Sequence, residues 1–363
     1  MEKNRKVLIL TSYLTGHGHA SITLALEDAL RARGVDFKTV EAYDMCSKMW
    51  RRSAKNYGKL TCRHPGVWKF LFWFSAQFPA LTDRAVARSC KKKFLKIFKE
   101  YRPDTVVTAH PLFTGSILDI LEKNRLSCRF VTVIADLVSI SPLWIDERSD
   151  MTVCPSRECM AYALRKGLHP GKLKVINLPT RTSITERAKT VTETGRAYDG
   201  RIRLFMISGA EGSGDMAARV RELLKIKNSS VTVIAGRNAV LEKSLKEEFG
   251  ANPAVEIHGF VNNIGDMMPR HDIAIVRGSP NVLMECVNLA VPVIVTDYLG
   301  GQEPGNVDFI ITRGLGLFCF DKSNLRGFVE QYLQNDRELL KSTRQNQFKH
   351  RDLDAAAKIA ALI

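Results

Sequence analysis

The stretch RGSPNVLMECVNLAVPVIVTDYLGGQEPGN, residues 277–306, carries the pattern that decides the fold. It predicts the end of a strand, a tight loop, a helix, an apolar strand over 292–296 and a polar, glycine-rich loop. Because the loop 278–281 falls where the helix begins, its free backbone N–H groups and the helix dipole favour an anion there. Glu285 follows about one turn into that helix. The spacing alone favours an ordinary β–α–β turn with a capped helix.

Length and composition limit the number of domains and the classes of partner. The chain has 363 residues, which favours two domains over one. Hydrophobic residues make up 45% and charged residues 25%, so the chain can bury substantial cores and is not disordered overall. Its formal net charge of +16 attracts polyanions. Charge alone leaves nucleic acid, an anionic membrane leaflet and acidic substrates open.

Cysteine usage and the N-terminus indicate the compartment. The 8 cysteines form no CxxC pair, which argues against a zinc site or a disulfide framework and favours a reducing compartment. The first apolar run, at 7–11, is short and enters a glycine loop, so it suits a buried strand better than a signal peptide. No stretch approaches the length of a membrane-spanning helix. We expect a cytoplasmic protein.

The first half of the chain alternates strands with helices, which predicts a doubly wound parallel sheet. Its first strand ends in the loop Gly16-His17-Gly18-His19, whose glycines lack the GxGxxG dinucleotide pattern. Two later strands end at His110 and at Asp136. Since the carboxyl ends of parallel strands share one edge, these polar side chains can meet there. His17 and His110 are expected to be structural or to line a cleft.

Residues 46–101 interleave aromatic and basic side chains. That pattern fits a helix lying in an anionic membrane interface, and it also fits a helical insertion whose aromatics form core. The side chains singled out as an acceptor or membrane contact are Trp68, Phe72, Trp73, Arg51 and Arg52. Proteins that bind single-stranded nucleic acid also combine basic with aromatic side chains. No RNA-binding signature accompanies these residues, so no nucleic-acid partner is expected.

The α/β pattern restarts after a polar stretch. We predict a first domain over 1–180, a linker over 181–200 and a second domain over 201–339, with a tail over 340–363 that packs back on the first. The prediction is thus an α/β protein of two Rossmann-like domains facing across a cleft.

Taken in order, these loops resemble the monogalactosyldiacylglycerol synthase and processive diacylglycerol glucosyltransferase family, which belongs to the inverting, metal-independent glycosyltransferases of the GT-B fold. The resemblance covers most of the chain and is strongest over 256–309. Its motifs are His19 in a Gly-His loop, His110-Pro111, Asp136 with Pro142-Leu143-Trp144, Pro155-Ser156, the loop 209–214, Gly236-Arg237-Asn238, Gly259-Phe260-Val261, Glu285 and the loop 301–307.

The resemblance implies a UDP-sugar in the second domain. Phe260 and Val261 would hold the uracil, and the 278–283 turn would meet the diphosphate. Glu285 suits ribose hydroxyls, because a charged acceptor makes strong hydrogen bonds. The implied donor-binding residues are Gly209, Gly212, Arg237, Phe260, Val261, Ser279, Pro280, Asn281, Val282, Glu285, Gln302, Glu303 and Asn306. No metal or other cofactor is implied, since backbone donors and the helix dipole can offset the leaving diphosphate.

The implied reaction is transfer of a hexose from a UDP-hexose to diacylglycerol, by a protein bound peripherally to the inner face of the cell membrane. Inverting displacement needs one general base, for which His19 is predicted, with Asp136 as the alternative base or as the carboxylate that orients the histidine. The alternatives are transfer to another lipid-linked acceptor, and a non-catalytic, membrane-associated protein that binds nucleotide sugars.

The chain also departs from the family at the diphosphate turn. It has Ser279 where the family usually has glycine, and Asn281-Val282 where the family has a Gly-Thr pair. We expect these larger side chains to crowd the diphosphate.

Overall fold

The structure is a computed structural model that describes residues 5–15, 17–56, 65–207 and 215–363, and only the backbone of His17, Pro65, Trp68 and Lys322. Its chain divides into two compact units. Unit 1 comprises Met1–Arg181, Gly300–Gln302 and Asp354–Ile363, and unit 2 comprises Thr182–Leu299 and Glu303–Leu353.

Unit 1 is built on a parallel sheet of six strands in the order β2-β1-β3-β4-β5-β6. The strands are β1 (Lys6–Thr11), β2 (Asp36–Glu41), β3 (Thr105–Thr108), β4 (Arg129–Val133), β5 (Met151–Cys154) and β6 (Leu173–Val175). The central strands β1, β3 and β4 are almost wholly buried. Their continuous apolar runs are therefore those of a parallel sheet that is covered on both faces.

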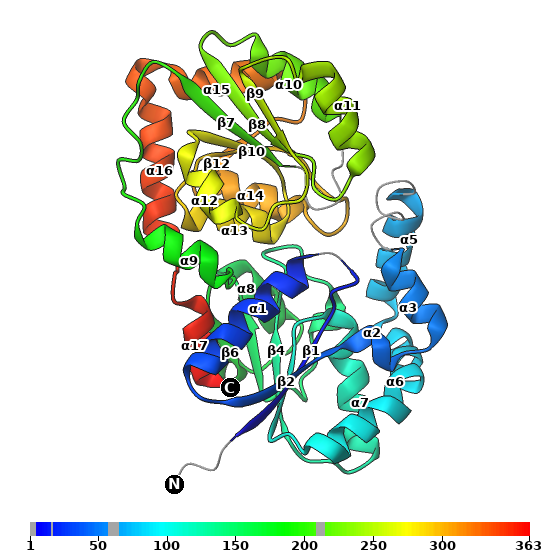
Figure 1. Cartoon of the computed structure of the whole chain (residues 1–363). Helices are drawn as coiled ribbons and strands as arrows, with labels where there is room; N and C mark the ends of the chain where they lie inside the picture. Colours follow the sequence, from blue (N-terminus) through cyan, green and yellow to red (C-terminus); the bar gives the residue numbers. More distant parts are fainter. Residues whose placement is uncertain (1–4, 16, 57–64, 208–214) are drawn as a thin grey trace. The chain divides into compact units, whose positions relative to one another are not determined.

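The helices of unit 1 include the long α6, which packs beside the shorter α7 (Figure 1). They are α1 (His17–Ala32), α2 (Ala42–Met45), α3 (Lys48–Lys55), α5 (Pro65–Gln77), α6 (Pro79–Tyr101), α7 (Gly115–Lys123), α8 (Arg157–Arg165) and α17 (Ala355–Leu362), with 3₁₀ turns η1 (Pro111–Phe113), η2 (Pro142–Trp144) and η3 (Pro170–Lys172). Phe94 of α6 and Ile117 of α7 share one core cluster with Leu8 of β1. The C-terminal helix α17 lies beside α1 (Figure 1).

Helix α1 begins earlier than the start near residue 21 that the sequence pattern predicts. It starts at His17, so His19 lies in its first turn rather than in a loop. The glycine at 18 does not prevent this start, because the first N–H groups of a helix have no intrahelical partner to lose.

Unit 2 is a second parallel sheet of six strands, in the order β12-β11-β10-β7-β8-β9. The strands are β7 (Ile202–Ile207), β8 (Ser229–Ile234), β9 (Val255–His258), β10 (Ile273–Arg277), β11 (Val293–Asp297) and β12 (Gly316–Phe318). The helices are α9 (Thr182–Lys189), α10 (Met216–Leu224), α11 (Ala239–Phe249), α12 (Ile264–Met267), α13 (Pro280–Asn288), α14 (Pro304–Thr312), α15 (Leu325–Leu333) and α16 (Glu338–His350), with η4 (Met268–Arg270), η5 (Lys322–Asn324) and η6 (Asn335–Arg337).

Two segments of unit 2 differ from the sequence-based expectation. Residues 182–200 belong to unit 2 rather than to a separate linker, because α9 buries Ile184 and Ala188. The expected loop after β11 continues into α14, which places Asn306 in the first turn of a helix. Pro304 at the first helical position supplies the fixed φ that suits this start.

Candidate functional site

His19 is held as a neutral imidazole with one nitrogen left to accept a proton. Its Nδ1 lies 2.6 Å from the carbonyl oxygen of Ala109, which can only accept, so Nδ1 carries the proton and Nε2 has the lone pair. Burial lowers the pKa of His19 to about 4, against the opposing effect of the Ala109 bond. The side chain of His19 is therefore uncharged at neutral pH and can act as a base.

His110 packs against His19, with the ring centroids 4.6 Å apart. Its Nδ1 accepts from the N–H of Leu112 at 3.3 Å and so caps η1. Burial, and then the charge of His19, lower the pKa of His110 well below its usual range. This capping and packing agree with the structural role expected for His110.

Asp136 is buried beside the same cluster and has a specific partner. Its Oδ2 accepts from the indole Nε1 of Trp144 at 2.7 Å, and the Trp144 ring lies 6.3 Å from the ring of His19. Gln302, which groups with unit 1, places its Nε2 3.4 Å from Oδ1 of Asp136. Trp144 belongs to the Pro-Leu-Trp motif, but no pattern in the sequence indicates that its N–H orients the carboxylate.

In unit 2 the predicted donor-binding residues follow the carboxyl ends of several strands. Arg237 follows β8, Phe260 and Val261 follow β9, and Ser279 follows β10. Since all six strands are parallel, these ends lie along one edge of the sheet. Gly209 and Gly212, predicted for the same edge after β7, lie outside the described residues.

Phe260 and Arg237 form a stacked pair at this edge. The guanidinium carbon of Arg237 lies 4.6 Å from the centre of the Phe260 ring, which is 46% exposed. Stacking on Arg uses one face of the ring, and the exposed part of the ring can meet a planar base. Val261 beside it is partly buried.

The turn before α13 has the features of an anion site. Ser279 is the N-cap and makes no side-chain capping bond, and Pro280 at the first helical position has no N–H. The N–H groups of Asn281 and Val282 are thus the first donors at the positive end of the helix dipole. The N–H of Gly278 donates a hydrogen bond to the carbonyl oxygen of Asp297 at 2.7 Å.

Glu303 has a structural role that the sequence did not indicate. Its carboxylate oxygens lie 3.1 and 3.2 Å from Nε and Nη2 of Arg277, and Oε2 accepts from the N–H of Leu299 at 2.6 Å. These bonds close the loop between β11 and α14, and the predicted contact of Glu303 with the donor stays a prediction. Arg277 went unnoticed because nothing in the spacing pairs it with a residue on the next loop. Glu285 is buried within α13.

Helix α5 and the start of α6 expose apolar side chains on unit 1. We call the following set the α5 surface: Val67, Phe70, Leu71, Trp73, Phe74, Phe78 and Leu81, each at least 42% exposed. Phe70 lies 6.1 Å from Trp73 and 6.4 Å from Phe74, ring to ring. Phe72 is only partly exposed, and the side chain of Trp68 lies outside the described part of the chain. The predicted contacts Arg51 and Arg52 are exposed on α3.

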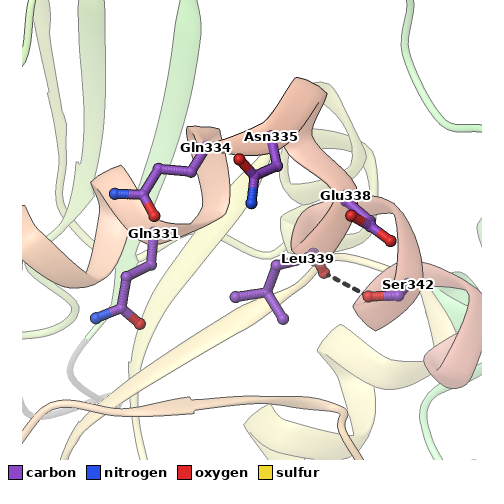
Figure 2. A pocket seen from close by; sticks show the side chains of 6 residues that line it. All are labelled: Gln331, Gln334, Asn335, Glu338, Leu339 and Ser342. Atoms are coloured by element: carbon purple, nitrogen blue, oxygen red, sulfur yellow. Dashed lines mark hydrogen bonds between the residues drawn. The ribbon is translucent and has the colours of Figure 1, made fainter.

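Other features of the described residues bear on what the protein binds. They contain no group of three His, Cys, Asp or Glu side chains placed to hold a metal ion. No helix in the described ranges has the length and apolar character needed to cross a membrane. A hollow of about 360 Å³ lies between α15 and α16 and is lined by exposed residues such as Gln331 and Glu338 (Figure 2). None of the predicted site residues lines it.

Comparison with known proteins identifies the family. Residues 19–180 match the family model of monogalactosyldiacylglycerol (MGDG) synthase, and residues 207–333 match that of glycosyl transferases group 1. A Nicotiana tabacum protein named as a probable chloroplastic MGDG synthase is 30% identical over 382 residues, which cover 99% of this chain and 70% of the relative. The chain belongs to the MGDG synthase family. The MGDG synthase of Spinacia oleracea is 29% identical over 99% of this chain and 72% of its own length.

Solved structures confirm the GT-B fold of this MGDG synthase family member. MurG of Acinetobacter baumannii superposes with a TM-score of 0.65 at 13% identity, over 99% of each chain. The S. aureus MnaA–UDP complex superposes with a TM-score of 0.65 at 12% identity, over 98% of this chain and 94% of that one. The spinosyn rhamnosyltransferase SpnG with thymidine diphosphate superposes with a TM-score of 0.63 at 10% identity, over 99% of each chain.

Proposed function

We propose that this member of the MGDG synthase family transfers a hexose from a UDP-sugar to diacylglycerol, with inversion at the anomeric carbon. The observation that carries the proposal, besides family membership, is the neutral His19 imidazole with Nδ1 tied to Ala109. An enzyme that removes a hydroxyl proton in one displacement needs a fixed, unprotonated general base, and this nitrogen can serve as one.

In this mechanism the hydroxyl oxygen of diacylglycerol attacks the anomeric carbon of the donor sugar. The new carbon–oxygen bond forms as the bond from the anomeric carbon to the β-phosphate oxygen breaks, and UDP leaves with that electron pair. The hydroxyl proton passes to Nε2 of His19. Asp136, held by Trp144 near His19, offsets the positive charge that the imidazole gains.

The donor half of the proposal rests on the strand-end edge of unit 2. The exposed ring of Phe260 stacks on the uracil, with Arg237 behind it. The N–H groups at the start of α13 meet the diphosphate and stabilise the leaving group as its charge develops. Two structural neighbours are complexes with nucleoside diphosphates, UDP in MnaA and thymidine diphosphate in SpnG. No metal is needed in this scheme.

The test compares transfer by wild-type protein and by two histidine variants, using UDP-glucose or UDP-galactose and diacylglycerol in lipid vesicles. We expect His19→Ala to lower kcat about 10²- to 10⁴-fold, the range for loss of a general base. His169→Ala is the matched control, because His169 caps only the short turn η3. Wild-type rates in His19→Ala would show that His19 is not the base.

We also propose that the α5 surface docks on the anionic inner leaflet of the cell membrane. Helices α3 and α5 contain basic residues and no acidic ones. Exposed aromatic side chains enter the headgroup region while nearby bases pair with anionic lipid. The seven described cysteines are unpaired, which fits the reducing cytoplasmic side.

Vesicle sedimentation tests this docking. We expect binding to vesicles with anionic lipid, weaker binding to zwitterionic vesicles, and a loss of about tenfold in affinity for Trp73→Ala with Phe74→Ala. Phe320→Ala is the matched control, since Phe320 is 75% exposed but belongs to unit 2. Equal binding by the double variant and the control would contradict the proposal.

A further inference from the structure

Two buried carboxamides at the α13 turn have oxygen atoms without partners. Asn281 is 9% exposed and Asn306 is 0% exposed. Among the described residues, neither Oδ1 has a hydrogen-bond partner. A buried acceptor that is left unsatisfied is costly, so two at one turn indicate that a ligand or water supplies the missing donors.

The position of Asn306 is fixed by its own amide. Its Nδ2 donates to the carbonyl oxygen of Gly278 at 2.9 Å. Because Nδ2 and Oδ1 share one planar amide, the unpaired oxygen also lies beside the turn. Asn281 belongs to the first turn of α13, three residues after Gly278. The two acceptors therefore border the N–H groups that we assign to the diphosphate.

Acceptors and donors at this turn suit different parts of one ligand. A phosphate oxygen accepts hydrogen bonds, so it pairs with backbone N–H groups and not with a carboxamide oxygen. The oxygens of Asn281 and Asn306 instead require a hydroxyl or an N–H. In a nucleotide sugar, the hydroxyl nearest the diphosphate is on C2 of the sugar, since C2 is bonded to the carbon that carries the phosphate. The ribose hydroxyls are separated from the diphosphate by the C5′ methylene.

We propose that Asn281 is a specificity-determining residue that accepts a hydrogen bond from the 2-hydroxyl of the donor sugar. This inference rests on the proposed function. Asn306 keeps the turn in place through Gly278 and completes the acceptor pair. The donor favoured by this arrangement is a UDP-hexose with a free 2-hydroxyl, in preference to its 2-deoxy form.

Calorimetric titration of the full-length protein tests the proposal without requiring turnover. The probes are UDP, UDP-glucose, UDP-galactose and the 2-deoxy forms of both sugars. For the preferred hexose we expect wild-type protein to bind the hydroxylated donor about tenfold or more tightly than its 2-deoxy form. In Asn281→Ala the gap closes to less than about threefold, because neither donor then has the carboxamide to bind. Asn346→Ala, an exposed carboxamide on α16, keeps the wild-type gap.

Three results would overturn the inference. The first is a wild-type protein that binds both donor forms equally, and the second is an Asn281→Ala variant that keeps the full gap. The third is an affinity for UDP alone that falls in Asn281→Ala as much as the affinity for the UDP-hexose, which would assign Asn281 to the nucleotide. In each case UDP-sugar binding by wild-type protein survives, so the proposed function stands. Absence of any UDP-sugar binding would overturn both.

Discussion

Asp83 offers a test of how burial and charge act on unit 1. It lies in the second turn of α6, and its carboxylate reaches the start of α7, where a Cβ added to Gly115 would clash with Oδ2. Its Oδ1 is buried without a hydrogen-bond partner in the described structure. Burial, and then repulsion from Asp146 and Asp119, raise the pKa of Asp83 from its usual 3.8 to about 7.

The substitution Asp83→Asn removes the charge and keeps the shape. Because the folded-state pKa exceeds that of the unfolded chain, protonation stabilises the fold below about pH 4, and this stability is lost as the pH rises through 7. A shift of about three units is equivalent to about 4 kcal/mol at 1.36 kcal/mol per unit. Since Asp83 is partly exposed, solvent screening reduces the effect, and we expect about 1–3 kcal/mol.

Thermal unfolding of both proteins between pH 4 and pH 8.5 measures this effect. We expect similar midpoints near pH 4 and a midpoint about 2–8 °C higher for Asp83→Asn above pH 8. The buried histidines are present in both proteins, so their contribution to the pH dependence cancels when the two midpoints are subtracted. A midpoint difference that does not change with pH, or that favours wild-type protein as the pH rises, would refute the reasoning.

Three further substitutions have definite expected outcomes. Trp144→Phe leaves Asp136 buried without its indole donor, so kcat/KM should fall about 10- to 100-fold with the fold intact by circular dichroism; an unchanged rate would contradict the orienting role. Arg277→Gln leaves the buried Glu303 carboxylate without its cationic partner, which we expect to cost about 2–4 kcal/mol in urea unfolding and to weaken UDP binding, whereas Arg277→Lys should recover part of the stability and part of the binding. Gly115→Ala forces a methyl group against a carboxylate, so we expect a loss of about 1–3 kcal/mol by the same assay; wild-type stability would show that α6 and α7 separate at little cost.

Much of the fold could be predicted from local patterns. Apolar strand runs and glycine-rich strand ends indicated two parallel α/β sheets, and the ordered loops indicated the family. Family, GT-B fold and glycosyltransferase class are confirmed by the comparisons. The start of α1 at His17, the helix α9 and the helix α14 were not predicted, because each begins with polar or glycine-containing sequence that also suits a loop.

The site was harder to predict, because its decisive contacts join residues that are distant in sequence. His19 was chosen for its residue type and loop, but its tautomer depends on the carbonyl of Ala109. Glu303 was predicted only as a donor-binding residue, and its bonds to Arg277 and to a backbone N–H were not foreseen. Such pairings depend on strand order, which a single sequence does not encode locally. The roles of the remaining donor-binding and membrane residues stay predictions.

The central claim is single-step, inverting transfer to a lipid, and the anomeric configuration of the product tests it most directly. Wild-type protein is incubated with UDP-glucose or UDP-galactose and diacylglycerol vesicles, and the extracted lipid is examined by proton NMR. Because the sugar of these donors is α-linked to phosphate, we predict a hexosyl diacylglycerol with a β linkage. An α-linked product, or no lipid-linked hexose from either donor while UDP still binds, would contradict the claim.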